Sequence, residues 1–239
     1  MGLLTSAAQP HLFPEAFLPP LENGDRLTRV EFERRYAAMP EHVRAELVEG
    51  VVIMASPVRF TRHGVPHADL ITWAGNYRAG TAGVLGGTDA TVRLDLDNEP
   101  QPDVCLLIDP ARGGKARIDE DDYINGAPEF VAEVAASTVS HDLGPKLNAY
   151  RRNGVCEYLV WRVQDTAIDW FVLREGRFDR LLPDADGVTR SGVFPGLWLD
   201  TAALLSGDLA RVHAVLRDGL ASPTHTAFLT SLAVTPTSR

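Results

Sequence analysis

The chain has 239 residues, 45% of them hydrophobic and 23% charged, which is enough for one globular domain with a large core. The longest apolar runs, 51–55 and 104–108, are far too short to cross a bilayer, so we expect no membrane partner. The net charge of −9 argues against binding of nucleic acid over a broad positively charged surface, but it does not exclude a small basic groove. Cys105 and Cys156 lie in apolar runs, which is typical of buried free thiols in a reducing cytoplasm.

The first part of the chain contains an arm, two helices and a strand pair. Residues 1–25 are rich in proline and lack periodicity, which predicts a flexible arm. Over 27–39, Phe32, Tyr36 and Met39 recur at the i, i+4 and i+7 positions of one helical face. A strand pair, a second helix and a glycine-rich turn segment follow, over 46–55, 67–78 and 80–87.

The second part alternates apolar runs with a helix. Strands are predicted for three apolar runs, over 91–96, 103–108 and 129–135. The charged segment 109–125 between the last two is expected to be a surface loop. A helix is predicted over 142–153, where Asp142 suits the N-cap and Gly154 the end. Two further strands and a weakly helical region complete the series, over 157–162, 168–173 and 202–216.

This order of helix, hairpin, helix, strands, helix and strands favours a single mixed α/β domain over 26–219. The last residues, 220–239, are rich in serine, threonine and proline, and we expect them to form a flexible C-terminal tail.

Three charged residues sit where their chemistry is unusual. Asp103 opens an apolar strand, Glu133 lies in the middle of another, and Lys146 lies beside the apolar stripe of the helix that follows. A buried carboxylate is costly unless it is paired or bound to a metal. Each residue alone also has an ordinary structural interpretation, namely a turn cap for Asp103, a wet strand face for Glu133 and a solvated lysine for Lys146.

Together the three residues suit phosphodiester hydrolysis. Two carboxylates on neighbouring strands can hold Mg²⁺, a hard cation that takes oxygen ligands and keeps waters. The metal polarises a phosphoryl oxygen and lowers the pKa of a bound water, and a nearby ammonium stabilises the growing negative charge. Lys146 and Lys115 are the only lysines in a chain that otherwise uses arginine, which adds a hint that the ammonium of Lys146 matters.

The segment from Gln101 to Trp161 resembles the Uma-two type of restriction endonuclease, a group within the PD-(D/E)XK superfamily. The motifs that carry the resemblance are QPDV, APEFVAEV and DLGPKLNAYRRNGVCEYLVW, with ELVEG, ASP and HADL upstream and FPGLWLD near the end. The resemblance covers roughly 28–205 and implies a restriction-endonuclease-like α/β fold, with a mixed central sheet flanked by helices.

Carried over residue by residue, the resemblance implies that Asp103 and Glu133 are the two motif acids and that Lys146 is the motif lysine, displaced from position 135 to the next helix. It further implies that Glu46 completes the metal shell and that Gln101 and His67 lie near the site. The loop after the second acid reads Ala-Ala-Ser-Thr over 135–138 and is one residue shorter than the family pattern.

The resulting hypothesis is a cytoplasmic Mg²⁺-dependent DNA endonuclease, with Mn²⁺ as a possible substitute and a homodimer as a possible assembly by resemblance. Two alternatives stay open: a catalytically silent nuclease-fold protein used for nucleic-acid binding or assembly, and a phosphodiesterase acting on a small nucleotide in a closed pocket. His63 and His67 have the i, i+4 spacing of a metalloprotease helix, but no Glu follows His63 and Pro66 intervenes, so the motif does not predict zinc.

Overall fold

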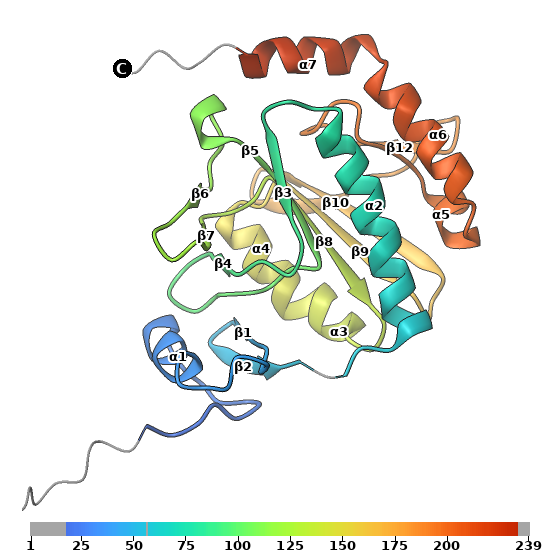
Figure 1. Ribbon diagram of the computed structural model, residues 1–239. Coiled ribbons are helices and arrows are strands. Elements are labelled where there is room, and N and C mark those ends of the chain that lie inside the picture. Colours follow the sequence, from blue (N-terminus) through green and yellow to red (C-terminus); the bar gives the residue numbers. More distant parts are fainter. Residues whose placement is uncertain (1–17, 56, 234–239) are drawn as a thin grey trace, which may run out of the picture.

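The computed structural model describes residues 18–55 and 57–233, and its centre is a six-stranded sheet (Figure 1). The strand order is β11-β10-β9-β8-β5-β3, in which β8 and β9 run parallel and the other neighbours antiparallel. The bounds of the strands are β3 Val84–Gly87, β5 Val104–Ile108, β8 Phe130–Ala135, β9 Glu157–Arg162, β10 Ala167–Arg174 and β11 Arg177–Arg180. The mixed central sheet that the sequence predicted is confirmed.

Strands β5 and β8 lie next to each other and are almost entirely buried. They pair antiparallel, with Val104 opposite Ala132. Apart from Glu133, both strands are apolar throughout because helices cover both faces of the sheet, which leaves no solvent-exposed face. The prediction that the strands of Asp103 and Glu133 lie side by side is therefore confirmed.

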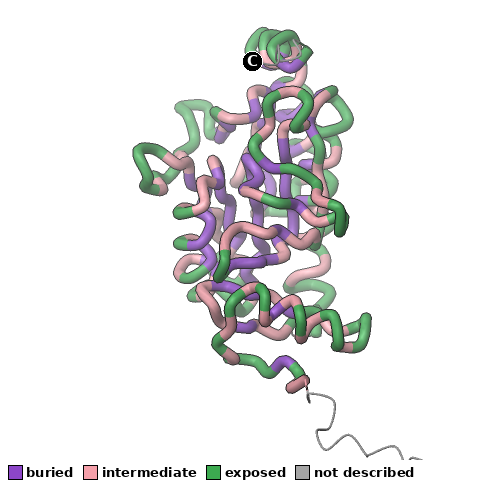
Figure 2. Tube along the Cα trace, turned by 90° about the vertical axis from the view of Figure 1, so that its left-hand side faces the viewer, coloured by how far each residue is buried: buried purple, intermediate pink, exposed green. Residues whose placement is uncertain are grey.

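Two helices cover opposite faces of this sheet, α2 (Val65–Ala79) and α4 (Leu147–Asn153) (Figure 1). Trp73 of α2 packs edge-on against Phe130, with ring centroids 6.0 Å apart. On the other face Tyr150 of α4 belongs to a second core cluster. Figure 2 shows how the buried residues gather along the central strands between these layers.

Three helices at the C-terminal end and two small sheets surround the centre. The helix α6 packs against α2 and extends the first core. The bounds of these elements are α5 Thr201–Ser206, α6 Leu209–Leu220, α7 Pro223–Ala233, β12 Val188–Arg190, β13 Trp198–Asp200, β4 Val92–Arg93, β6 Arg117–Ile118, β7 Ile124–Asn125 and the short helix η2 Pro110–Arg112.

An N-terminal lobe, made of α1 (Arg29–Tyr36), β1 (Ala45–Val48) and β2 (Val51–Met54), lies below the sheet in Figure 1. It has a small apolar core of its own, which includes Phe32 and Leu47. Its two strands form the predicted hairpin. Glu49 and Gly50 occupy the turn with φ angles of 53° and 70°, as a tight type I′ hairpin turn requires. A bridge between Leu47 and Glu99 ties the lobe to the rest of the chain and so places β1 near the sheet.

The prediction of a strand over 91–96 is largely wrong. Only β4 is extended there, and it pairs with β7 in a separate three-stranded sheet. Beyond it the Asp95 carboxylate accepts hydrogen bonds from the Asp97 amide and the Asn98 side chain, which bends the chain into a turn. The sixth position of the central sheet belongs to β3, from the glycine-rich segment. A Cβ at Gly86 would lie 2.9 Å from Leu106, so glycine allows β3 to approach β5.

The expectation of a flexible tail over 220–239 is wrong for its described part, because Pro223–Ala233 form α7. The hydroxyl of Ser222 accepts a hydrogen bond from the amide of His225, and Pro223 takes the first helical position, so the helix start is well formed. Leu232 is buried in the first core cluster. The composition is typical of a tail, but tertiary packing of one helical face outweighs it.

The predicted arm over 1–25 falls mostly on residues 1–17, which lie outside the described part of the chain. Its described end is held in place. Leu21 is buried in the core of the N-terminal lobe, and the amide of Gly24 donates to the carbonyl of Val52. Among the helices of residues 18–55 and 57–233, none combines the length and the apolar character that crossing a membrane requires.

Candidate active site

Asp103 and Glu133 occupy neighbouring strand positions at one end of the sheet. Asp103 directly precedes β5, and Glu133 follows the Ala132 that pairs with Val104. The carboxylate of Asp103 accepts a hydrogen bond of 2.6 Å from the backbone amide of Val134, so it lies against the strand that carries Glu133. The two residues are 8% and 4% exposed. The fold thus places two buried carboxylates on adjacent strands.

Lys146 lies between two carboxylates. Its Nζ is 2.9 Å from Oε1 of Glu133 and 3.0 Å from Oε1 of Glu46, and the lysine is only 5% exposed. The hydroxyl of Tyr150 donates a further hydrogen bond of 2.9 Å to Oε1 of Glu133. The structure therefore brings together three of the residues singled out in the sequence, although Glu46 comes from the N-terminal lobe.

The local helix geometry explains how Lys146 reaches this position. The segment begins with α3 (Val139–His141), continues as the π-helical turn η3 (Asp142–Lys146) and ends as α4. A π-turn holds one residue more than an α-turn and is frequent at functional sites. Lys146 and Tyr150 are four residues apart, so both side chains lie on the helix face toward Glu133. Pro145 lies inside the π-turn, where it lacks the N–H that a regular helix would use.

Negative charge exceeds positive charge around Lys146. Burial raises the pKa of Glu133 well above its usual range, against the lowering effect of Lys146, while the nearby acids Asp103, Asp142 and Glu46 raise it further. Burial opposes the charge on Lys146, but the carboxylates of Glu133 and Glu46 outweigh this effect and raise the pKa of the lysine. One ammonium thus faces three acids, Glu133, Glu46 and Asp142, so negative groups outnumber positive ones beside it.

Gln101, expected near the site, acts through its backbone. Its amide donates a hydrogen bond of 2.5 Å to Oε1 of Glu46, whereas its side chain donates to the hydroxyl of Thr91. Oε1 of Glu46 therefore accepts hydrogen bonds from both Gln101 and Lys146, which fixes the carboxylate.

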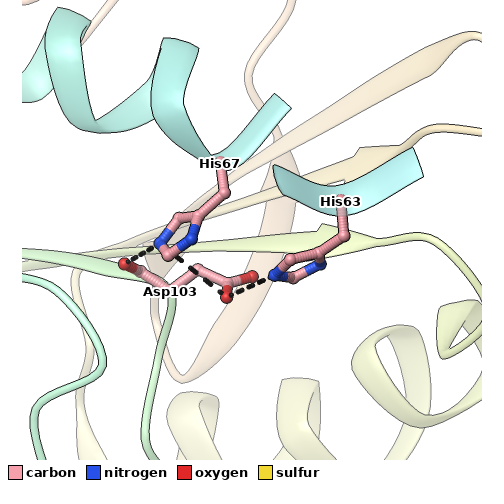
Figure 3. Close-up of side chains that lie close together, drawn as sticks. All are labelled: His63, His67 and Asp103. Carbon is pink, nitrogen blue, oxygen red and sulfur yellow. Dashed lines mark hydrogen bonds and ion pairs between the residues drawn. The ribbon is translucent and has the colours of Figure 1, made fainter. Parts of the chain in front are cut away.

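Two histidines lie against Asp103 on the side that faces α2 (Figure 3). His63 belongs to the π-helical turn η1 (Phe60–Gly64), and its Nε2 is 3.3 Å from Oδ1 of Asp103. His67 lies one turn further along, in α2. Its Nε2 is 2.9 Å from the backbone oxygen of Asp103 and 4.0 Å from Oδ1. The candidate ligand atoms of the three residues all lie within 4.8 Å of one another.

His63 is the site residue that sequence reasoning missed. The i, i+4 spacing with His67 is the signal that the sequence offers, but the metalloprotease motif with this spacing takes its third member, a glutamate, from the same helix. Here the acid is Asp103, which lies in another part of the sequence. The hydrogen bond to Asp103 raises the pKa of His63. Burial opposes the charge on Asp103, but the hydrogen bonds from His63 and Val134 lower the pKa of this acid overall.

The Uma2 family model, described as "Putative restriction endonuclease", matches residues 29–202 and so spans every residue of this site. The chain belongs to the Uma2 family. A crystal structure described as "a putative nuclease belonging to DUF820 from Anabaena variabilis ATCC 29413" is similar, with a TM-score of 0.57 and 13% identity over 72% of this chain and 96% of that chain. At this identity the similarity shows a shared fold alone. No curated protein matches the chain.

Proposed function

We propose that this Uma2 protein is a metal-dependent endonuclease that hydrolyses phosphodiester bonds of DNA. Asp103, Glu133 and Lys146 are its catalytic residues in this proposal, and Glu46 is a further metal ligand. The observation that carries it is the buried Lys146 ammonium, which bonds to Glu133 and Glu46 at the end of the strand next to Asp103. The family supports a nuclease, and the site supplies residues with the required chemistry.

The donor atoms are of the kind that a hard divalent cation binds, although among the described residues the carboxylates of Asp103, Glu133 and Glu46 are not a group whose ligand atoms all lie within 4.8 Å of one another. Asp103, Glu133 and Glu46 offer carboxylate oxygens, which are the ligands that Mg²⁺ prefers and Mn²⁺ accepts. When bound, such an ion supplies a polarised phosphoryl oxygen and a water of lowered pKa. The hydroxyl of Tyr150 holds Oε1 of Glu133 in place, and the amide of Val134 holds the carboxylate of Asp103. Both acids are thus oriented before a ligand arrives.

Lys146 contributes positive charge in a fixed position. Its ammonium has three donors, and within the described part of the chain two of them are used by Glu133 and Glu46. The third can donate to a phosphate oxygen or to the attacking water. In a buried site such a donor stabilises the negative charge that develops on the phosphoryl group more strongly than it would in water.

The segment in front of α2 offers contacts for nucleic acid. Arg59, Phe60 and Arg62 are all exposed, and Phe60 is 78% exposed. They surround the start of the π-turn that carries His63. Two guanidinium groups and an exposed aromatic ring are the residue types that bind phosphates and stack on bases. A local basic and aromatic segment explains how a protein of net charge −9 could bind DNA.

The deciding experiment compares the native chain with Glu133→Gln in cleavage of plasmid and of single-stranded DNA, with Mg²⁺ or Mn²⁺. We expect the substitution to abolish metal-dependent cleavage, because an amide cannot replace the carboxylate as a charged ligand, while circular dichroism stays unchanged. Glu120→Gln, at an exposed loop position, is the matched control and should cut like the native chain. Undiminished cleavage by Glu133→Gln would contradict the proposal. A native chain that binds DNA without cutting it would favour the catalytically silent alternative.

A further inference from the structure

The carboxylate of Asp103 points at two imidazole rings that the proposed chemistry does not use (Figure 3). Oδ1 is 3.3 Å from Nε2 of His63 and 4.0 Å from Nε2 of His67. The side chains of the three residues are 12–22% exposed, so the cluster is sheltered but open to a small ion. Two residues of one helical segment and one residue at a strand end thus converge on one point.

The orientation of His63 is fixed by the strand that carries Glu133. Its Nδ1 lies 3.3 Å from the carbonyl oxygen of Val134. A carbonyl oxygen can only accept a hydrogen bond, so Nδ1 carries the hydrogen and Nε2 is the atom that faces Asp103. In the neutral ring Nε2 is an acceptor directed at a carboxylate, an arrangement that needs a proton or a metal ion between the two atoms. Histidine ligands of metals usually donate their second N–H to a backbone carbonyl or a carboxylate in this way.

The spacing also suits a metal ion. Two ligand atoms that are each about 2.0–2.2 Å from one ion lie about 3–4 Å apart at the usual coordination angles. The separations of 3.3 Å and 4.0 Å from Oδ1 of Asp103 fall in this range. His67 donates its Nε2 hydrogen to the backbone oxygen of Asp103 at 2.9 Å, so to become a ligand through Nε2 it must take the other neutral tautomer, with the hydrogen on Nδ1.

We propose that His63, His67 and Asp103 bind a first-row transition-metal ion, such as Mn²⁺, Co²⁺ or Zn²⁺, in preference to Mg²⁺. The physical reason is the donor set, because imidazole nitrogen suits these ions, whereas Mg²⁺ takes oxygen ligands. The inference rests on the proposed function, since Asp103 serves both, and it goes beyond the carboxylate donor set by adding two imidazole ligands that favour transition metals.

Metal binding without DNA tests the assignment. Co²⁺ and Mn²⁺ are titrated by calorimetry into the native chain, His63→Ala, His67→Asn and the control His42→Ala, whose histidine is exposed in the N-terminal lobe. Co²⁺ additionally reports nitrogen ligation through its visible absorption. We expect both site variants to bind Co²⁺ at least about tenfold more weakly and to lose the nitrogen-ligated spectrum, while His42→Ala binds like the native chain.

His67→Asn keeps a donor for the backbone oxygen of Asp103 but removes the imidazole. Native affinity in this variant would overturn the assignment of His67 as a ligand, and native affinity and spectrum in His63→Ala would overturn the site as a whole. His63→Gln guards against misfolding, because its amide can still donate to the carbonyl of Val134. We expect it to bind Co²⁺ as weakly as the alanine variant.

The same proteins separate the two proposals. If Glu133→Gln cuts DNA as well as the native chain, the nuclease assignment fails, whatever the histidines bind. If the native chain cuts with Mg²⁺, and His63→Ala and His67→Asn bind Co²⁺ like the native chain, the nuclease assignment stands and the transition-metal site fails.

Discussion

At the scale of single residues, the site buries more acidic groups than basic ones around Lys146. Lys146 is surrounded by acids, and its two ion-pair partners, Glu46 and Glu133, come from different parts of the chain. Removing one member of a buried ion pair usually costs more than the pair itself contributes, because the remaining charge has no partner. Substitutions at this position therefore need a control that removes the same charge elsewhere.

Lys115 provides this control. We expect Lys146→Ala to lower the cleavage rate by about 10²–10⁴-fold, the range for general acid–base assistance, while Lys115→Ala has little effect. The ammonium of Lys115 is exposed and lies 3.4 Å from the sulfur of Cys156, the residue before β9. Lys146→Arg should not restore activity, because a guanidinium is too basic to share a proton and has a different shape. Equal losses for the two alanine variants, measured on plasmid DNA, would remove Lys146 from the mechanism.

Glu99 makes a pH-dependent contribution to stability. Burial, together with the neighbouring Glu33, raises the pKa of Glu99 to about 8, although Arg93 lies 3.9 Å from its carboxylate. Because the pKa of the unfolded state is lower, this group contributes stability below about pH 4.5, and the contribution is lost as pH rises toward 8. We expect Glu99→Gln to raise the free energy of unfolding at pH 9 by on the order of 1 kcal/mol and to change it little at pH 4.

Urea unfolding of the native chain and Glu99→Gln at the two pH values measures this difference. A constant difference between the two proteins at pH 4 and pH 9 would show that the ionisation of Glu99 is not linked to folding.

At the scale of elements, two π-turns shape the candidate site. One contains His63 and the other ends at Lys146. Each lies at the start of a helix that packs on the central sheet, one on each face. The extra residue of each π-turn changes the direction of the side chains there, and His63 and Lys146 contact the acids from these turns. The helices that follow pack on the sheet as regular α-helices.

The first of these turns should also contact DNA. We expect the double variant Arg59→Ala, Arg62→Ala to bind DNA more weakly and with a smaller dependence on salt, because fewer phosphate charges are neutralised. Phe60→Ala should weaken binding of single-stranded DNA by about 1–3 kcal/mol if the ring stacks on a base. Arg177→Ala, on the edge strand β11, is the control. Fluorescence anisotropy at several salt concentrations gives both quantities, and identical salt slopes for all variants would exclude this segment.

How much could be predicted from the sequence also differs between elements. The strands next to Asp103 and around Glu133 could be predicted because both are apolar runs of strand length. The two acids stood out as candidate site residues because a charge in such a run is costly to bury unless it is paired or bound to a metal. The edge strand β3 could not, because Gly86 and Gly87 have low strand propensity and serve close backbone approach instead. His63 could not be predicted as a site residue because its acidic partner Asp103 is 40 residues away in the chain. Their contact depends on the packing of α2 against β5.

At the scale of the whole molecule, the site is assembled from parts of the chain that lie far apart. Glu46 belongs to the N-terminal lobe, Glu133 to the central sheet and Lys146 to the π-turn before α4, and Asp103 is the residue before β5. A ligand that binds all of them binds the folded state alone and must therefore stabilise it.

We expect saturating Mn²⁺ to raise the Tm of the native chain, since a ligand at 100 times its Kd stabilises the folded state by about 2.7 kcal/mol. In Glu133→Gln the rise should be smaller but not absent, because the carboxylate set loses one ligand while His63, His67 and Asp103 can still hold Mn²⁺. Differential scanning fluorimetry with and without Mn²⁺ measures both shifts, and EDTA-treated protein sets the baseline. An unchanged Tm of the native chain at all Mn²⁺ concentrations would contradict a metal site in the folded protein.

The separate core of the N-terminal lobe has a consequence for how activity is lost on warming. The lobe is attached through contacts such as the bridge between Leu47 and Glu99, and it packs around Phe32 apart from the two cores of the sheet. Such a unit can open locally while the remainder stays folded. Each opening would withdraw Glu46 from Lys146. We therefore expect the lobe's amides to exchange with solvent earlier than those of β8, and cleavage to fade at temperatures where the central sheet is still intact.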